Sequence, residues 1–217
     1  GKANQYFLRG FKLDHGPDLA ISVDGMPVNM LTHGHGQGYA DINFLIPELI
    51  QSVDVRKGPY YADKGDFASA GAVDINYLDR LSKNIVELTA DSFGCQRAMS
   101  AGSTKWCDGT LLAAFEANKY NGPWDVPDDV RKLNGVLRYS QGTATDGFSL
   151  TAMAYSNGWN STDQVAQRAI DQGLIGRYGS LDPTDGGTSS RFSLSGNWAQ
   201  SSDYGQTKLN AYVIRSS

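Results

Sequence analysis

Apolar and polar residues alternate with a period of two through most of the chain after residue 84. In residues 110–120, the apolar side chains of Leu111, Ala113, Phe115 and Ala117 are interleaved with polar ones such as Glu116. Successive side chains of a β-strand point to opposite faces, so as a strand this segment has one apolar and one polar face. The alternation recurs in residues 148–155, 191–198 and 208–213, and residues 85–104 and 133–143 complete six predicted strands.

The alternation also predicts which side chains share a face. One expected face is apolar and suited to lipid, with Phe115, Leu150, Leu194 and Val213. The other is polar and suited to a water-filled lumen, with Glu116, Thr151, Ser195 and Asn210. Strands of about ten residues have the length that a tilted strand needs to cross a bilayer.

The predicted strands are joined by connections of two unequal lengths. Residues 105–109, 144–147 and 202–205 are short and carry Asp or Gly, which favour tight turns. Residues 123–132 and 159–190 form much longer loops. Short turns that alternate with long loops are typical of outer-membrane β-barrels, whose short turns face the periplasm.

The longest loop carries a helix signal. Ser161 and Gln164 make a capping box, the apolar residues Val165, Ala166, Ala169 and Ile170 form a stripe, and Gly173 suits a helix end. Asp182 and Asp185 in the same loop do not have the spacing of an EF-hand, so a plain turn is favoured over a calcium site there.

Composition and charge narrow the class of protein. The 217 residues include 25 Gly, 11 Tyr and 4 Trp, a bias toward strands and turns. The net charge of −4 is spread evenly, and without a basic stripe we expect no nucleic-acid partner. No apolar run approaches the roughly 18 residues of a membrane-spanning helix, which excludes a helical membrane protein. A soluble β-sandwich or jelly roll would show the same alternation and remains an alternative.

Three motifs precede the alternating region. They are Leu8-Arg9-Gly10-Phe11, Val23-Asp24-Gly25-Met26-Pro27, and Ile50-Gln51-Ser52-Val53-Asp54-Val55-Arg56-Lys57-Gly58-Pro59. In this order, followed by Ala70-Gly71-Ala72-Val73-Asp74-Ile75, they resemble the plug domain of TonB-dependent outer-membrane receptors. Asp54 stands where the family usually has glutamate, and Lys57 where arginine is commoner.

The resemblance implies a fold and a domain division. The expected fold is a mixed α/β plug, the C-terminal portion of which occupies residues 1–80. Antiparallel transmembrane strands, the first of a plugged barrel of about 22 strands, then occupy residues 81–217. Six strands cannot close such a barrel, so we expect more strands downstream. The resemblance also implies a signal sequence, a TonB box and the start of the plug upstream.

Local signals inside the predicted plug agree with this fold. Residues 20–24 read as a strand that ends in an Asp24-Gly25 turn, with Pro27 at a sheet edge. Residues 47–50 suit a short helix with Pro47 in its first turn, and residues 52–56 suit another strand.

The implied function is TonB-dependent active transport of a scarce solute, most often a ferric siderophore in this family, across the bacterial outer membrane. The implied partners are TonB with its inner-membrane energising complex, a small-molecule or metal-chelate substrate, and outer-membrane lipid. Two alternatives stay open, a passive outer-membrane channel or surface-binding barrel and a secreted sugar-binding β-sandwich. No catalytic motif such as Gly-x-Ser-x-Gly or His-Glu-x-x-His occurs, and we expect neither an enzyme nor a cofactor.

Candidate substrate-binding residues lie in segments that the resemblance places on the outward side of the plug. They are Arg9, His15, His33, His35, Gln37 and Tyr39. Around His33 and His35, alternating glycines let the backbone approach a ligand while the imidazoles offer hydrogen bonds. A surface loop with incidental histidines remains an alternative, and metal ligation lacks the third and fourth ligands that a site needs.

Charged plug residues and the two cysteines complete the expectations. Arg9, Asp54 and Lys57 are expected in ion pairs within the plug or with the barrel wall, because buried charge needs partners. A turn centred on residues 105–108 would place Cys95 opposite residue 118, which disfavours a disulfide with Cys107.

Overall fold

The computed structural model describes residues 4–8, 11–13, 18–33, 37–162 and 164–217. A two-stranded hairpin comes first, with β1 (Tyr6–Leu8) and β2 (Phe11–Leu13). The small sheet contains β3 (Leu19–Val23), β4 (Met26–Pro27), β5 (Ile50–Lys57) and β6 (Gly71–Tyr77), and the short 3-10 helix η1 (Pro47–Leu49) precedes β5. Among the described residues, no helix is both long and apolar enough to span a membrane.

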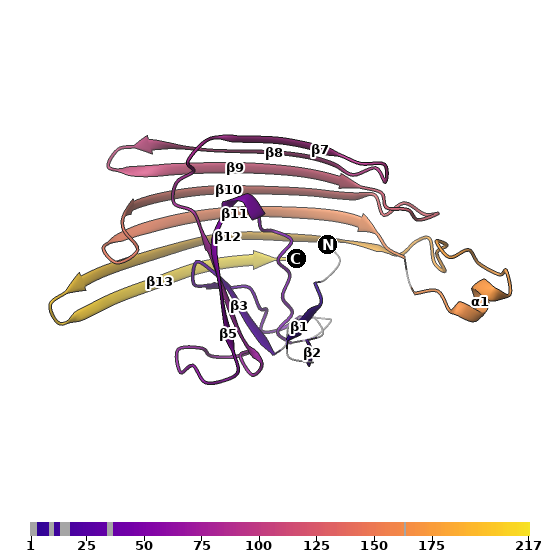
Figure 1. The fold of residues 1–217 in the computed structure, drawn as a ribbon, viewed down its shortest axis with the longest axis horizontal. Coiled ribbons are helices and arrows are strands. Elements are labelled where there is room, and N and C mark those ends of the chain that lie inside the picture. Colours follow the sequence, from indigo (N-terminus) through magenta and orange to yellow (C-terminus); the bar gives the residue numbers. More distant parts are fainter. Residues whose placement is uncertain (1–3, 9–10, 14–17, 34–36, 163) are drawn as a thin grey trace.

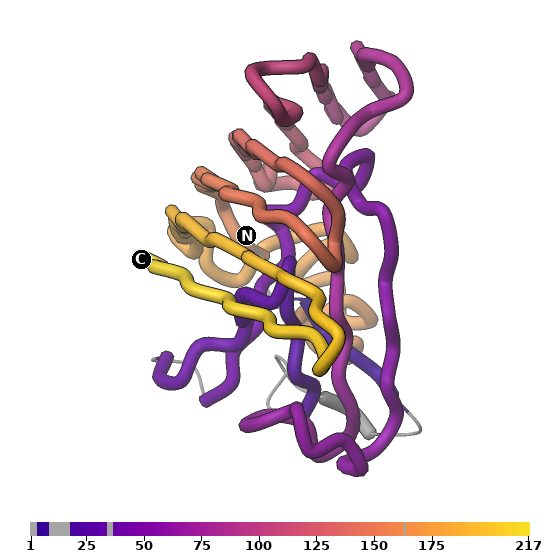
Figure 2. Tube along the Cα trace, turned by 90° about the vertical axis from the view of Figure 1, so that its left-hand side faces the viewer, coloured from indigo at the N-terminus to yellow at the C-terminus, as the bar shows by residue number. Residues whose placement is uncertain are grey.

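The large sheet is an antiparallel meander in which each strand pairs with the next (Figure 1). Its strands are β7 (Ile85–Ala90), β8 (Gln96–Trp106), β9 (Gly109–Tyr120), β10 (Val130–Gly142), β11 (Gly147–Asn160), β12 (Gly186–Ser202) and β13 (Gly205–Ser216). The helix α1 (Gln167–Asp171) lies in the long connection after β11. Figure 2 shows that this sheet is curved and that the N-terminal segments lie on one side of it.

The prediction of a single strand over residues 85–104 was wrong, because a turn divides this segment into β7 and β8. The Asp91 carboxylate accepts hydrogen bonds from the amides of Phe93 and Cys95, and Gly94 has a φ of 75°. The alternation continues on both sides of this turn, so the period alone does not reveal the reversal. The large sheet therefore has seven strands in the part of the chain that the structure describes.

The expected division into two faces is confirmed. Phe115, Leu150, Leu194 and Val213 are about half exposed or more on the outward face. Glu116, Thr151 and Ser195 retain only 1–2% of their accessible surface on the inward face. Asn210 also points inward and donates a hydrogen bond to the backbone oxygen of Asp24 at 3.1 Å. Glu116, Thr151 and Ser195 are thus buried beneath the N-terminal segments, while Asn210 contacts them from an exposed position.

The small sheet has the strand order β4-β3-β6-β5, with β3 and β6 parallel and the other pairs antiparallel. Asp24 and Gly25 have φ values of 47° and 77°, which is the left-handed backbone of a tight hairpin turn and confirms the predicted turn. Pro27 lies in the edge strand β4, where its missing N–H costs no ladder hydrogen bond. The predicted strand at residues 52–56 is part of β5, and Pro47 opens η1.

The two sheets share one continuous apolar core. The small sheet contributes Leu19, Ile21, Val23, Met26 and Ile75, and the segment before β5 contributes Phe44, Ile46 and Leu49. The inward face of the large sheet adds Met99, Leu112, Val136 and Met153. Because both sheets contribute to this core, the small sheet is packed against the large one as well as hydrogen-bonded to it. Burying one such side chain stabilises the fold by roughly 1.5–3 kcal/mol.

The capping box predicted at Ser161 and Gln164 was wrong. The helix α1 begins later, after Ala166, and this residue makes no side-chain cap. The reason is that the Ser161 amide donates to the Asp185 oxygen at 2.8 Å and so extends the pairing of β11 with β12. Gly173, with a φ of 70°, ends the helical segment as predicted, and Asp182 forms a turn through Thr184.

Both cysteines are free thiols. Gln96 pairs with Lys119, so the turn is centred one residue later than the sequence suggested. Cys95 and Cys107 stand at opposite ends of the 11-residue strand β8, which agrees with the prediction against a disulfide between them.

Candidate functional site

Arg97 on β8 connects the two sheets through a cluster of carboxylates. Its guanidinium binds both oxygens of Glu48 in η1, with Nη1 to Oε1 at 2.8 Å and Nη2 to Oε2 at 2.9 Å. It also donates to the inward Glu116 at 2.6 Å and to Glu87 at 3.0 Å. Lys132 adds a second cation to Glu116 at 2.8 Å. Burial alone would raise the pKa of Glu48, yet the hydrogen bonds from Arg97 hold it below its usual value.

Asp24, from the Val-Asp-Gly-Met-Pro motif, is the centre of a second connection. Its carboxylate accepts a hydrogen bond from Arg138 Nη1 on β10 at 2.9 Å and one from the Tyr77 amide at 3.1 Å. Arg138 is shared with Thr151 at 2.7 Å and with Asp79 at 2.9 Å. Burial raises the pKa of the Asp24 carboxyl, and the neighbouring Arg138 opposes that rise. The motif therefore forms a turn, and its Asp24 also provides the buried carboxylate that pairs with Arg138 of the large sheet.

Two further side chains of the large sheet hold the backbone of the N-terminal segment. Asn134 donates to the Asn43 oxygen at 3.1 Å, and Arg191 donates to the Pro27 oxygen at 2.9 Å. The Arg191 guanidinium also stacks over the Phe44 ring, with its central carbon 4.8 Å from the ring centroid. These contacts fix the segment between β4 and η1 against the inward face of the large sheet.

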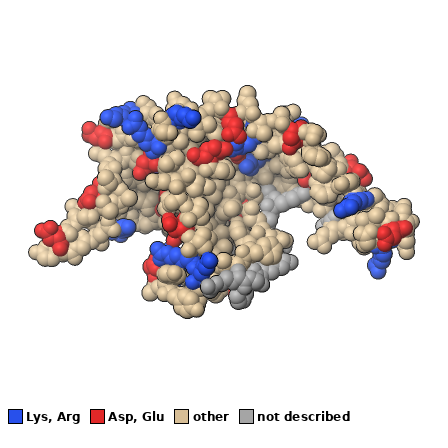
Figure 3. All heavy atoms as spheres, viewed as in Figure 1, with Lys and Arg blue, Asp and Glu red and all other residues tan. Residues whose placement is uncertain are grey.

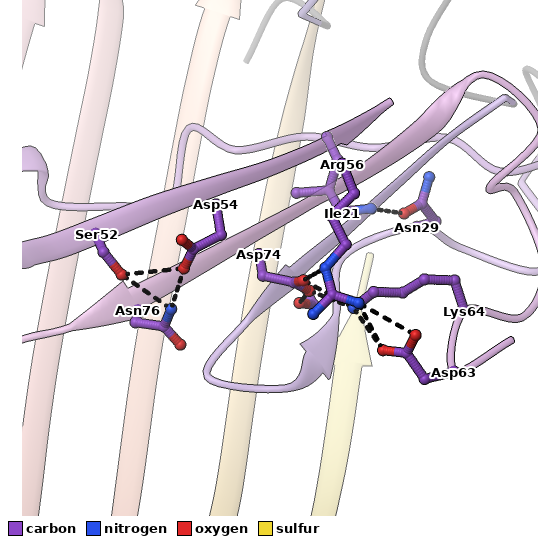
Figure 4. A network of polar contacts seen from close by, with 10 residues as sticks. Ile21, Asn29, Ser52, Asp54, Arg56, Asp63, Lys64, Asp74 and Asn76 are labelled. Carbon is purple, nitrogen blue, oxygen red and sulfur yellow. Dashed lines mark hydrogen bonds and ion pairs between the residues drawn. The ribbon is translucent and has the colours of Figure 1, made fainter. Parts of the chain in front are cut away.

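The polar face of the small sheet carries a separate network (Figure 4). Lys64 donates to both oxygens of Asp74 at 2.7 and 2.8 Å, and Ser22 donates to Asp74 at 2.6 Å. Burial would raise the pKa of Asp74, but these hydrogen bonds lower it. Arg56 pairs with Asp63 at 2.9 Å.

Asp54 and Lys57 were predicted to contact the barrel wall, but other residues make the contacts between the two sheets that the structure describes. Asp54 is bonded within the small sheet, to Ser52 and Asn76 at 3.3 Å each (Figure 4). Lys57 is exposed at the end of β5. Their contact with a barrel wall stays a prediction, while Asp24 and Glu48 make the contacts that the described part of the chain displays.

The histidine-containing loop is closed at its base by Asn29. The Asn29 amide nitrogen donates to the oxygens of Leu19 and Gly38 at 3.0 Å each, and its oxygen accepts from the Ile21 amide at 2.7 Å. Above this base, the His33 and Tyr39 rings stack in parallel with centroids 4.1 Å apart. Gln37 is exposed beside them. The candidates Arg9, His15 and His35 lie outside the described residues.

Three side chains of the large sheet that sequence reasoning missed lie near this loop. Tyr155, Asn157 and Arg191 each bury a polar side-chain atom, and Nε of Arg191 has no hydrogen-bond partner in the described part of the chain. Asp41 lies within electrostatic reach of Tyr39, Tyr155 and Arg191. Burial, followed by the charge of Asp41, raises the pKa of Tyr39. The sequence contains one signal that could have identified Arg191. This arginine alternates with serines on the inward side of β12, namely Ser189, Ser193 and Ser195.

This arrangement can bind a polar ligand through hydrogen bonds, a cation and stacked rings. The described residues contain no group of three or more His, Cys, Asp or Glu side chains placed to hold a metal ion. On the face drawn in Figure 3, basic and acidic groups are interspersed instead of forming one basic stripe.

Comparison with known proteins identifies a domain in the N-terminal part of the chain and the fold of the whole chain. Residues 1–72 match the model of the TonB-dependent receptor plug domain. The siderophore receptor PirA from Acinetobacter baumannii has a similar structure, with a TM-score of 0.61 and 18% identity over 94% of this chain. The ferric citrate transporter FecA in its unliganded form is similar over 99% of the chain, with a TM-score of 0.78 and 13% identity. Residues 1–72 thus carry a plug domain of the TonB-dependent receptor type, and the chain as a whole shares the fold of these two receptor structures.

The chain spans 33% of the length of each of these two solved structures. No curated protein sequence matched it. The small sheet is the core of the plug, and the large sheet is part of the β-barrel wall. The secreted β-sandwich considered above is therefore the wrong fold.

Proposed function

We propose that this receptor imports a scarce solute across the outer membrane by TonB-dependent active transport. The observation that carries the proposal is the set of charged contacts between plug and wall, namely Arg97 with Glu48 and Arg138 with Asp24. A plug held in this way blocks the lumen, so solute passes only if these contacts rearrange. Binding of substrate alone supplies no sustained work against a gradient, so an external energy source is needed.

The proposed substrate-binding surface is the outward side of the plug loop together with the wall beside it. His33, Gln37 and Tyr39 belong to it, and Tyr155 and Arg191 extend it onto the barrel. Arg9, His15 and His35 remain candidates by their position in the sequence. A surface with a cation, tyrosines and amides suits an anionic or hydroxyl-rich metal chelate, and a ferric siderophore is the cargo that we favour.

The proposal includes partners and a domain division. Residues 1–80 would act as the C-terminal part of the plug and residues 81–217 as wall strands. TonB and its inner-membrane complex would supply the energy, with no cofactor and no enzymatic step. The names of PirA and FecA refer to a siderophore and to ferric citrate respectively, and they favour iron chelates among the possible cargoes.

The test measures uptake and binding of a radiolabelled ferric siderophore panel in cells that express the complete receptor. We expect accumulation to stop when TonB is deleted or the proton-motive force is collapsed, while surface binding persists. In the same binding assay, His33→Ala with His35→Ala should weaken binding at unchanged receptor levels. Accumulation that continues without TonB would instead identify a passive channel, the second candidate.

A further inference from the structure

The outward face of the wall has a hollow of about 580 Å³ at the end that carries the long loops. Its floor is formed by Ala98 and Ala117, which are direct neighbours on β8 and β9. On either side stand larger apolar side chains, Leu88 on β7 and Leu133 on β10, which are 79% and 51% exposed. The hollow exists because two alanines lie between two leucines in one row across four strands.

Cations border this hollow on the side of the long loops. Lys119 and Arg131 are direct cross-strand neighbours on β9 and β10, one row closer to the loops than the alanines. The Lys119 side chain is exposed. Arg131 forms an ion pair with Asp129 at 2.8 Å, and 72% of the Arg131 side chain is exposed. An exposed ion pair of this kind contributes little to stability. Arg131 can therefore exchange Asp129 for another anion at a small cost in free energy.

The outward face is asymmetric along the strands. At the short-turn end, the outward register carries aromatic side chains, with Trp106 edge-on to Tyr139 at 5.9 Å and Tyr139 near Phe148 at 5.7 Å. Among the described strand residues, no Lys or Arg faces outward at that end. The outward cations Lys119, Arg131 and Arg215 all lie toward the long-loop end. Since long loops of outer-membrane barrels face the outside, the cations lie at the level of the outer leaflet.

We propose that this hollow binds a phosphate-bearing lipid of the outer leaflet. Lys119 and Arg131 contact the phosphate, and an acyl chain lies over Ala98 and Ala117 between Leu88 and Leu133. Basic groups at a membrane surface attract anionic headgroups, and apolar walls below them exclude water from the chain. The proposal concerns the lipid face of the wall and holds whether or not the receptor transports by the mechanism proposed above.

The experiment titrates the purified complete receptor with bis-phosphorylated lipid A and with the same lipid stripped of both phosphates, read by native mass spectrometry. For the wild type we expect preferential binding of the phosphorylated form, weakened by added salt. Lys119→Gln with Arg131→Gln should reduce its apparent affinity about twenty-fold. Arg215→Gln, an outward cation away from the hollow, serves as the matched control and should leave the affinity unchanged.

A second variant tests the apolar part of the site. Ala117→Trp fills the floor of the hollow and should weaken both lipid forms, while heat-resistant barrel migration in gels verifies folding. Wild-type affinity in the double glutamine variant would overturn the proposal. So would an equal loss in the Arg215 control, or equal wild-type binding of the two lipid forms.

Discussion

At the scale of single residues, Arg97 is the cation that joins a carboxylate of the plug to carboxylates of the wall. It binds Glu48 from the plug and Glu116 from the wall, and Glu116 retains only 1% of its accessible surface. A buried carboxylate that loses its cation keeps its desolvation penalty without compensation. Removing one partner therefore costs more free energy than the intact pair contributes to stability. Arg97 is therefore the residue at which the docking of the plug is most sensitive to substitution.

We expect Arg97→Ala to lower the free energy of plug docking by about 3 kcal/mol, at the low end for a buried pair, because Lys132 still neutralises Glu116. In native-state hydrogen exchange, amides of residues 42–50 should exchange on the order of a hundredfold faster. Lys105→Ala is the control, since this exposed lysine at the other end of β8 makes no ion pair within the described residues. Unchanged exchange in Arg97→Ala would show that the ion pairs do not hold the plug.

At the scale of elements, alternation along each wall strand separates a lipid face from a plug-covered face. Cysteines at Phe115, Leu150, Leu194 and Val213 should resist a water-soluble maleimide in membranes, in a Cys95→Ser, Cys107→Ser background. Cysteines at Glu116, Thr151 and Ser195 should also resist at first, because the plug covers these positions, and should react once urea loosens it. The cysteine at Asn210, an exposed inward position, should react without urea.

Labelling that rises equally in the two sets on adding urea would contradict the assignment of the faces. The measurement compares labelled fractions by mass spectrometry, with heat-resistant gel migration to verify that the barrel stays intact. Because the outward set contacts lipid instead of protein, loosening the plug should leave it protected.

The sequence predicts elements whose signals are local. Period-two alternation located the wall strands and their faces, and the Asp24-Gly25 pair located a turn that requires left-handed backbone. The turn between β7 and β8 was missed although Asp91 and Gly94 are turn-forming residues, because the alternation runs on beyond it. The strand β6 was seen only as a motif of small residues, since its pairing with β3 depends on a segment about 50 positions earlier.

The candidate site depends on contacts between distant positions, which a single sequence does not display. Asp24 and Arg138 are 114 residues apart, and Arg191 and Pro27 are 164 apart. No local pattern around Arg138 distinguishes a side chain that binds the plug from one that faces water, and the serines beside Arg191 show only that it is an isolated cation in its register. His33 and Tyr39, six positions apart in one loop, were identified together because both lie in the same glycine-rich motif.

At the scale of the whole molecule, the central claim is that the docked plug must move for solute to pass. The structure offers a place to lock it. A Cβ added at Gly25 would lie 3.4 Å from Cγ of Asn210, the carbon one bond beyond its Cβ, so cysteines at these two positions lie near the range in which a disulfide between plug and wall forms. Gly25 has a φ of 77°, so its replacement is strained, and the Gly25→Cys single variant controls for this strain.

The decisive measurement is energised uptake of labelled substrate by cells that carry the complete receptor with Gly25→Cys and Asn210→Cys in a Cys95→Ser, Cys107→Ser background. With the disulfide formed, we expect surface binding to persist and uptake to stop, and a reducing agent should restore uptake to the level of the single variants. Uptake at an unchanged rate through receptors shown by mass spectrometry to be fully cross-linked would contradict transport by plug movement at this contact.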